Sequence, residues 1–315
     1  GVWAISFASI ETVSSPTGAE LRLHVARASR PPIGVIQVNH GLAERSARYA
    51  RFAAAMAARG FDTYAHDHRG HGGTRAPDAP PRSFAREGGA DKVIADVAAV
   101  HDRIAADRPG VPVILFGHSM GGLIALNFLA RHSARVAAAA IWNANFSAGA
   151  LGRLAQGILA WEKFRMGSDV PSRILPRLTF QDWAKKVPNA RTPFDWLSRD
   201  EAEVDKYVAD PLCGWDASVS MWRDVFQLIF AGADDRNLAG IRKDLPVNLV
   251  GGEHDPATAG GKAVRDLERR LRAAGFSDVT ATIWRETRHE SLNEVNRDEI
   301  TDTFATWAEK VVQLK

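Results

Sequence analysis

The stretch VPVILFGHSMGGLIALNFLARH, residues 111–132, decides the fold. Its opening apolar run, VPVILF, predicts a buried strand, and LIALNFLARH has the apolar spacing of a helix. Between them Gly117 and Gly121 flank Ser119 in the G-x-S-x-G pattern. A tight turn from strand to helix can hold a serine in a strained conformation if glycines let the backbone pass closely. A plain glycine-rich loop is the alternative, but the order of strand, serine and helix favours a nucleophile.

Composition limits the class of protein. With 315 residues, 45% hydrophobic and 24% charged, the chain suits one α/β domain with an insertion, or two domains. The net charge is only +3 and the basic residues are dispersed, so we expect no nucleic-acid partner. The single cysteine, Cys213, excludes an internal disulfide and fits a reducing compartment. We find neither a membrane-spanning stretch nor a signal-peptide pattern and expect a cytoplasmic protein.

Short apolar runs alternate with helical segments, which is the pattern of a mostly parallel α/β sheet. The predicted strands are residues 33–39, 61–67, 111–116, 136–142, 245–252 and 279–284, and the predicted helices are 45–59, 91–107, 121–133, 260–274 and 297–313. An earlier hairpin is predicted over residues 5–27, with its turn at Pro16-Thr17-Gly18.

The alternation breaks between residues 143 and 236, where five of the nine tryptophans lie and several short helices are predicted. We therefore expect a helical cap over 143–236, inserted into a core formed by residues 1–142 and 237–315.

One predicted cap helix, LGRLAQGILAWEKF at residues 151–164, carries an apolar stripe. The stripe consists of Leu151, Leu154, Ile158 and Trp161. Packing of the stripe onto the core is the favoured interpretation. The alternatives are the wall of an apolar substrate tunnel and a surface that contacts lipid.

A nucleophilic serine needs a base and an acid that orients the base. In hydrolases built on a parallel α/β sheet, the acid and then the histidine follow the serine along the chain. The strand at 245–252 is followed by Glu253 and Asp255, and we prefer Asp255 because Pro256 turns the chain away there. The loop after the last strand provides His289, which has no second histidine four residues on and so does not form a zinc-binding helix.

The negative charge that develops on the substrate requires backbone N–H donors, which form an oxyanion hole. One donor is expected at Met120, directly after the serine, and the other in the loop after an early strand. That loop contains His40-Gly41-Leu42, so Leu42 is the second expected donor.

A histidine-rich stretch, HDHRGHGGT at residues 66–74, invites a metal-site interpretation. Apart from Asp67 it lacks a carboxylate or cysteine set at a convincing spacing, so we interpret it as a loop ordered by arginine and glycine turns.

Five stretches together resemble the monoacylglycerol lipase and lysophospholipase branch of the α/β-hydrolases. They are HGLAERSARY, HDHRGHGGT, GHSMGG, TPFDWLSRDEAEVDKYVADPLCGW and TRHESLNE. The resemblance spans about residues 10–313, and it implies an α/β-hydrolase fold with an inserted helical cap. It assigns the triad to Ser119, Asp255 and His289 and the oxyanion donors to Leu42 and Met120. The family's early loop usually reads His-Gly-x-Gly-Glu, whereas Ala43 stands here before Glu44, a departure expected to affect the pocket floor.

The resemblance predicts a serine hydrolase that cleaves lipid-like carboxylic esters through an acyl-enzyme, without cofactor or metal. We also expect Gly41, Arg48, Phe146 and Ile158 to contact the substrate, and the cap to touch a membrane surface transiently. The alternatives are a peptidase or amidase on the same scaffold, a short-chain carboxylesterase, and a non-catalytic binding protein.

Overall fold

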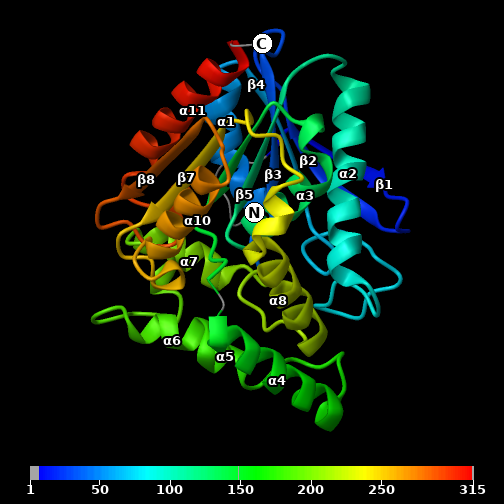
Figure 1. Cartoon of the computed structure of the whole chain (residues 1–315), viewed down its shortest axis with the longest axis vertical. Coiled ribbons are helices and arrows are strands. Elements are labelled where there is room, and N and C mark those ends of the chain that lie inside the picture. The colour runs from blue at the N-terminus through cyan, green and yellow to red at the C-terminus, as the bar shows by residue number, and fades with distance from the viewer. Residues whose placement is uncertain (1–6, 148, 314–315) are drawn as a thin grey trace.

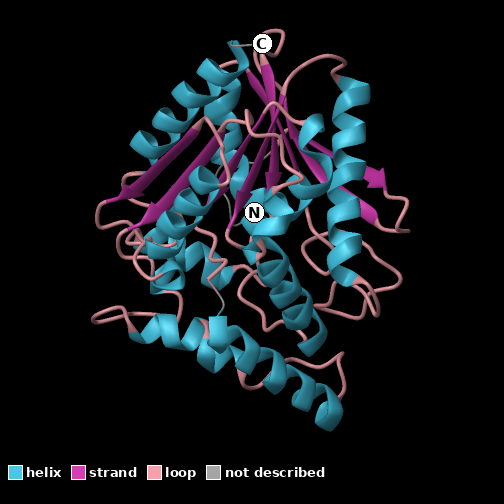
Figure 2. Ribbon diagram, viewed as in Figure 1, coloured by secondary structure: helices cyan, strands magenta, loops and turns pink. Residues whose placement is uncertain are grey.

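An eight-stranded mixed sheet forms the centre of the molecule in the computed structural model, which describes residues 7–147 and 149–313. Its strands are β1 (Ser9–Ser14), β2 (Glu20–Ala26), β3 (Gly34–Asn39), β4 (Phe61–His66), β5 (Val113–His118), β6 (Ala138–Trp142), β7 (Val247–Gly252) and β8 (Val279–Trp284). They lie in the order β1-β2-β4-β3-β5-β6-β7-β8 (Figure 2). The strands from β3 to β8 pair in parallel, whereas β2 pairs antiparallel with both of its neighbours, β1 and β4.

The predicted strands and helices are confirmed, with small shifts at their ends. The predicted hairpin forms β1 and β2 around the Pro16-Thr17-Gly18 turn, where the Gly18 N–H donates to the Ser15 carbonyl at 2.9 Å. Residues 5 and 6 of that prediction lie outside the described residues. The helix predicted at 45–59 begins as a 3-10 turn, η1 (Ser46–Tyr49), and continues as α1 (Ala50–Ala58).

Helices cover both faces of the sheet, as its continuous buried strands require. The helices α1 and α11 (Arg297–Gln313) pack on one face around Phe52, Phe116 and Phe304. The opposite face carries α2 (Gly89–Asp107), α3 (Met120–His132) and α10 (Lys262–Ala273) over a second apolar core. Figure 1 shows this three-layer arrangement.

The chain between β6 and β7 forms the additional helices α4 (Gly149–Met166), α5 (Leu175–Leu178), α6 (Phe180–Lys185), α7 (Glu201–Ala209), α8 (Val219–Ala233) and α9 (Asp235–Leu238), with a 3-10 turn, η3 (Asp195–Leu197). The helices α4, α5 and α6 lie across the end of the sheet toward which the parallel strands run (Figure 1). In contrast, α8 packs against α2 and α3 as well as α4. The division of the chain at residues 143 and 236 stays a prediction.

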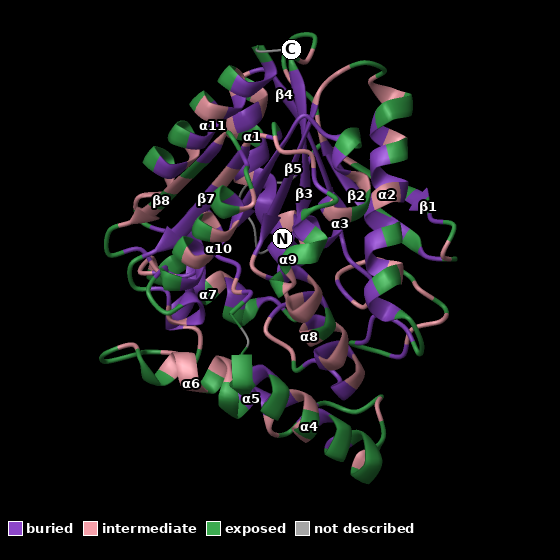
Figure 3. Ribbon diagram, in the orientation of Figure 1, coloured by how far each residue is buried: buried purple, intermediate pink, exposed green. Residues whose placement is uncertain are grey.

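Of the apolar stripe predicted on α4, only Ile158 packs against the core as expected. Leu151, Leu154 and Trp161 are exposed, and Figure 3 shows that much of α4 faces solvent. The buried face of α4 is offset by one position and consists of Gly152, Ala155, Leu159 and Glu162. Glu162 is accommodated there because its carboxylate accepts hydrogen bonds from the Ser172 hydroxyl and the Arg173 N–H. Hydrophobic spacing alone misses this face, since one member is charged. Among the helices of the described residues, none is long and apolar enough to cross a bilayer.

Candidate active site

Ser119 lies in the sharp turn between β5 and α3. Its backbone has φ 58° and ψ −120°, a conformation that non-glycine residues rarely adopt, and its N–H donates to the Trp142 carbonyl at 2.8 Å. A Cβ atom on Gly117 would lie 2.1 Å from the Gly121 carbonyl oxygen, and one on Gly121 would lie 2.0 Å from that of Asn39. Both glycines are therefore sterically required, which explains the sequence pattern.

Ser119, His289 and Asp255 form a continuous hydrogen-bonded chain. The Ser119 Oγ lies 2.9 Å from His289 Nε2, and His289 Nδ1 lies 2.9 Å from Asp255 Oδ2. Asp255 follows β7 and His289 follows β8, so the parallel topology brings their loops to the edge of the sheet where β5 ends. The structure thus brings together all three residues singled out from the sequence.

Asp255, not Glu253, faces the histidine. The Asp255 carboxylate is fully buried and also accepts hydrogen bonds from the Ala257 N–H, the Thr258 hydroxyl and the Asn143 amide at 2.9, 2.9 and 3.2 Å. Burial raises the pKa of Asp255, but the charge and hydrogen bond of His289, together with the other donors, hold that pKa below its usual value. Glu253 is exposed and accepts the Glu286 N–H at 2.7 Å.

Two backbone amides next to Ser119 are available as donors. The Met120 N–H is the first of α3, and Leu42 lies in the loop after β3. Neither donates a hydrogen bond to another residue in the part of the chain that the structure describes. A Cβ built on Gly41 would lie 3.5 Å from the Ser119 Cβ, so the early loop runs directly past the serine. Both amides therefore belong to segments next to the position that a substrate oxyanion would occupy.

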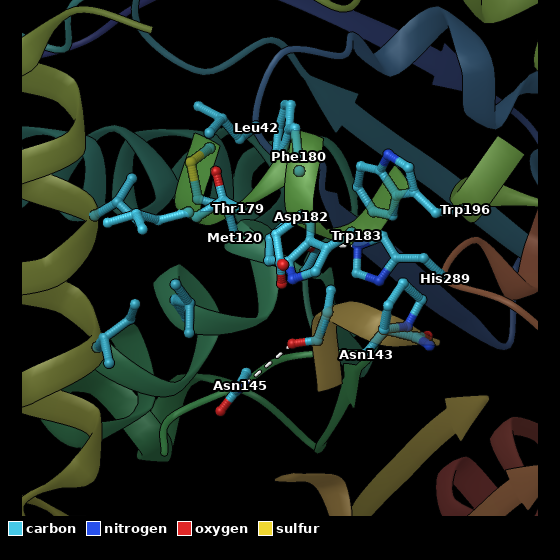
Figure 4. Close-up of a pocket in the computed structure, with 18 of the residues that line it drawn as sticks. Leu42, Met120, Asn143, Asn145, Thr179, Phe180, Asp182, Trp183, Trp196 and His289 are labelled. Atoms are coloured by element: carbon cyan, nitrogen blue, oxygen red, sulfur yellow. Dashed lines mark hydrogen bonds between the residues drawn. The ribbon is translucent and has the colours of Figure 1, made fainter. Parts of the chain in front are cut away.

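A largely apolar cavity of about 320 Å³ opens at these residues. Figure 4 shows Leu42, Met120, Trp196 and His289 at its wall. The chain between β6 and β7 provides most of the apolar lining, which includes Leu151, Ala155, Leu175, Leu178, Phe180, Trp183, Trp196, Leu197, Trp222, Val225, Phe226 and Ile229. Polar side chains are fewer, among them Asn145, Thr179, Asp182 and Lys186. The cavity can therefore enclose a long apolar group beside Ser119.

Of the four residues expected to contact substrate, only Gly41 lines this cavity. Phe146 is buried in the core, where its ring fills the space that a side chain on Gly232 would need. Ile158 is half-buried and packs against the core, one position away from the buried α4 residue Leu159. The expectation for Phe146 and Ile158 is therefore corrected to core packing.

The expectation for Arg48 is also corrected, because its guanidinium is buried beneath the site and bound to carboxylates. It contacts Glu290 through two hydrogen bonds of 2.6 Å and Glu44 through one of 2.9 Å. Glu44 in turn accepts the Gly41 N–H at 2.8 Å. Arg48 thus connects the loop of Gly41 to the residue that follows His289.

His118 completes this buried cluster, and its Nε2–H donates to the His289 carbonyl at 2.8 Å. Burial lowers the pKa of His118, but the carboxylates of Glu44 and Glu290 raise this pKa by more than burial lowers it. The net shift of the His118 pKa is therefore upward. For Glu44, burial raises the pKa and the charges of Arg48 and His118 lower it well below the usual range. Glu44, His118 and Glu290 were not predicted from the sequence, although they lie in HGLAERSARY, GHSMGG and TRHESLNE.

The cap contacts the histidine loop directly. The carbonyls of Trp196 and Leu197, in η3, accept the N–H groups of His289 and Glu290 at 3.3 and 2.7 Å. The centroids of the Trp196 and His289 rings lie 5.1 Å apart. Figure 4 shows the two side chains next to each other at the cavity. No local pattern in the sequence indicates that this tryptophan reaches the site. The cap therefore helps to place the histidine as well as lining the cavity.

The histidine-rich stretch is buried behind the loop of Gly41. Mainly because of burial, the pKa of both His66 and His71 is lowered to about 3. Both rings are therefore neutral at neutral pH. Across the described ranges, no group of three His, Cys, Asp or Glu side chains is arranged to hold a metal ion.

Strand order, the strained serine and the hydrogen-bonded chain through His289 define this molecule as an α/β-hydrolase. The chain belongs to the Hydrolase_4 family, whose model is described as "Serine aminopeptidase, S33" and matches residues 30–296.

Several relatives of this chain are named monoglyceride or monoacylglycerol lipases. Human monoglyceride lipase is 30% identical over 181 residues, which cover 58% of this chain and 52% of the human one, so the match spans about half of that relative's length. The monoacylglycerol lipase of Mycolicibacterium smegmatis is 26% identical over 278 residues, covering 88% of each chain.

Solved structures show the same fold. A thermostable carboxyl esterase from Bacillus coagulans superposes with a TM-score of 0.85 at 21% identity, covering 96% of this chain and 98% of that one. A soluble variant of monoglyceride lipase from Saccharomyces cerevisiae superposes with a TM-score of 0.73 at 16% identity, covering 98% and 96%.

Proposed function

We propose that this protein is a serine esterase that hydrolyses lipid-like carboxylic esters, of the monoacylglycerol or lysophospholipid type. The observation that carries the proposal is the Ser119–His289–Asp255 chain at the wall of a largely apolar cavity. The names of the human and mycobacterial relatives support the substrate class.

The reaction proceeds in two steps. The Ser119 Oγ attacks the acyl carbonyl carbon while His289 Nε2 takes the hydroxyl proton, and Asp255 stabilises the resulting imidazolium. The carbonyl electron pair moves to the oxygen, where the Leu42 and Met120 amides bind it. The tetrahedral intermediate collapses, and the leaving alcohol takes the proton from His289. Water, deprotonated by His289, then attacks the acyl-enzyme and releases the carboxylic acid and free Ser119.

Cavity chemistry favours an acyl chain over a peptide amino terminus. A free amino group needs an unpaired acidic partner, and the acidic side chain on the cap side of the cavity, Asp182, pairs with Lys186 at 3.3 Å. The acidic stretch 198–205 does not supply one, because none of its four acidic side chains lines the cavity. Asp200 and Glu203 bind Arg297 and Arg51, and both other carboxylates bind Arg191. Ester hydrolysis of an apolar substrate is therefore the better-supported function.

The exposed face of α4 suggests how such substrates are reached. Leu151, Leu154, Trp161 and Phe164 are exposed there, Phe164 by 85%. This face touches a lipid surface transiently in our proposal, and Leu151 also lines the cavity. Phe164→Glu should then reduce co-sedimentation with phosphatidylcholine vesicles without slowing hydrolysis of a soluble ester.

A matched pair of variants tests the substrate class. Ile229 lines the cavity, whereas Ile158 has similar partial burial outside it. Ile229→Trp should shorten the longest acyl chain that is accepted, since each excluded methylene costs about 0.8 kcal/mol, or about fourfold in kcat/KM. Ile158→Trp should leave the chain-length profile unchanged. The measurement is kcat/KM for p-nitrophenyl esters from acetate to palmitate; a parent that prefers acetate and declines steadily with length would contradict the lipid assignment.

A further inference from the structure

The Gly41–Leu42 peptide group is held on its carbonyl side by a buried histidine. The ring Nδ1 of His40 lies 2.7 Å from the Gly41 carbonyl oxygen. A carbonyl oxygen only accepts, so Nδ1 carries the proton. The Nε2 atom of the same ring accepts the His68 N–H at 3.0 Å, which requires that this nitrogen has no proton. Both contacts therefore specify the neutral Nδ1–H form of His40.

The next residue along the loop, Ala43, is held through its backbone N–H by a second buried histidine, His71. The Ala43 N–H donates to His71 Nε2 at 3.1 Å, and His71 Nδ1–H donates to the Arg69 carbonyl at 2.9 Å. The Ala43 carbonyl accepts the Gly214 N–H and the Tyr207 hydroxyl at 2.9 and 3.0 Å. His71 is therefore also a neutral Nδ1–H ring, in agreement with the lowered pKa of about 3 that burial causes.

Between these anchors the Leu42 N–H is left as a donor without an acceptor among the described residues. Its nitrogen and the Gly41 carbonyl belong to one planar peptide group, and the chain has no cis peptide bond in the described ranges. The C=O and N–H of a trans peptide point in opposite directions. A hydrogen bond that fixes the Gly41 carbonyl therefore fixes the Leu42 N–H, and it also polarises that N–H as a donor.

We infer that His40 and His71 are positioning residues that aim the Leu42 N–H at the substrate oxyanion. His40 orients the peptide through its carbonyl, and His71 fixes the residue that follows Leu42. This role explains why the histidine-rich stretch lies buried behind the early loop without forming a metal site in the described chain. The inference rests on the proposed esterase function, because an oxyanion forms only during acyl transfer.

Two pairs of variants separate positioning from packing. His40→Leu removes the donor to Gly41, whereas His40→Asn retains a side-chain N–H near the position of Nδ1. His71→Met removes the acceptor for Ala43, whereas His71→Gln retains a side-chain oxygen as acceptor. The matched control is His101→Leu, because His101 is a buried histidine that donates to the Arg135 carbonyl at 2.9 Å, away from the loop.

The readout is the affinity for an alkyl trifluoromethyl ketone, which forms a tetrahedral oxyanion with the serine, compared with that for the non-electrophilic alcohol of equal length. Active sites are counted by fluorophosphonate titration so that misfolded protein does not enter the comparison. We expect His40→Leu to weaken trifluoromethyl ketone binding by about 10- to 100-fold, less than the loss of a complete donor. The alcohol should change less than twofold, the Asn and Gln variants should recover most of the loss, and His101→Leu should show none.

Equal losses for ketone and alcohol, or an Asn variant as impaired as the Leu variant, would overturn the inference. A parent that neither reacts with fluorophosphonate nor binds the ketone would instead overturn the proposed function, and the inference with it. A second measurement determines the tautomers in the parent protein, by long-range ¹⁵N–¹H spectra of the intact chain. Variants of His40 and His71 serve there only to assign the signals of the two rings. Nδ1–H tautomers at His40 and His71 support the inference, and Nε2–H tautomers contradict it.

Discussion

Arg48 and Glu290 form a buried, doubly hydrogen-bonded ion pair, with both N–O distances at 2.6 Å. Arg48 also contacts Glu44 at 2.9 Å, and Glu44 binds the backbone of Gly41. One side of the cluster therefore holds the loop of the proposed oxyanion donor, and the other side holds the residue next to His289. A buried cation is required here, because two buried carboxylates without it would repel each other in a medium of low polarity.

Arg48→Met should therefore destabilise the protein by about 3–5 kcal/mol, the usual cost of leaving a buried charge uncompensated. The measurement is urea unfolding at neutral pH. Arg86→Met is the control, since the Arg86–Asp169 pair is exposed and should contribute less than about 1 kcal/mol. Similar midpoints for the two variants would show that the cluster does not stabilise the fold.

The two carboxylates after β7 should differ strongly in their effect on rate. Asp255→Asn removes the charge that orients His289 and stabilises its protonated form, so kcat should fall by about 10⁴-fold. Glu253→Gln should change kcat by less than about twofold, because Glu253 is exposed and its carboxylate accepts a hydrogen bond from the Glu286 N–H rather than from His289. Steady-state hydrolysis of a p-nitrophenyl ester measures both, and the reverse ranking would move the acid to Glu253.

Ala43 should tolerate glycine but not valine. Ala43 has a positive φ of 57° and is fully buried. It occupies the position where the lipase branch that this chain resembles usually has glycine. A left-handed conformation is accessible to glycine, whereas a β-branched side chain is strongly disfavoured there. Ala43→Gly should keep kcat/KM within about threefold, and Ala43→Val should lower kcat/KM and the melting temperature together. A fully active Ala43→Val protein would show that the loop conformation is not restrictive.

Stability should fall in mild acid partly because of His66. Burial, with a smaller effect of His40, lowers the His66 pKa from the ordinary 6.5 to about 3. Between these pH values the unfolded chain binds a proton that the folded protein does not, so the free energy of unfolding decreases as the pH falls.

His66→Leu should reduce this slope by up to about 1.4 kcal/mol per pH unit between about pH 6 and pH 4. The ring nitrogens of His66 have no hydrogen-bond partner within the described residues, so the apolar replacement removes no such bond. Urea unfolding from pH 8 to pH 4 measures the difference between parent and variant. That difference should be constant above about pH 7.5, where neither state binds the extra proton. Parallel curves down to pH 4 would contradict the lowered pKa.

The sheet could be predicted from the sequence because its strands are buried on both faces and read as short apolar runs between helical patterns. The sharp turn at Ser119 could also be predicted, since steric contact allows only glycine at 117 and 121. Ser119, Asp255 and His289 were found by their positions at strand ends, which parallel topology brings to one edge.

Other features depend on tertiary contacts that have no local signal. In the sequence, Arg48 is a polar residue shortly after the loop of Gly41 and Leu42. Only the fold shows that it pairs with Glu290, 242 residues away. On α4 the expected face was wrong because a buried carboxylate, Glu162, interrupts the apolar spacing of the face that packs. Trp196 contacts His289 because the chain between β6 and β7 folds back over the site. Hydrophobic patterning does not specify how that segment is placed.

The central claim is that Ser119 is the nucleophile that carries the acyl group, and mass spectrometry tests it directly. The protein is reacted with an alkyl fluorophosphonate, digested and analysed for the modified peptide. We predict one phosphonyl group per chain, on Ser119, with complete loss of labelling and ester hydrolysis in a folded Ser119→Ala variant. Modification of a different residue, or an unlabelled parent that still hydrolyses esters, would contradict the assignment.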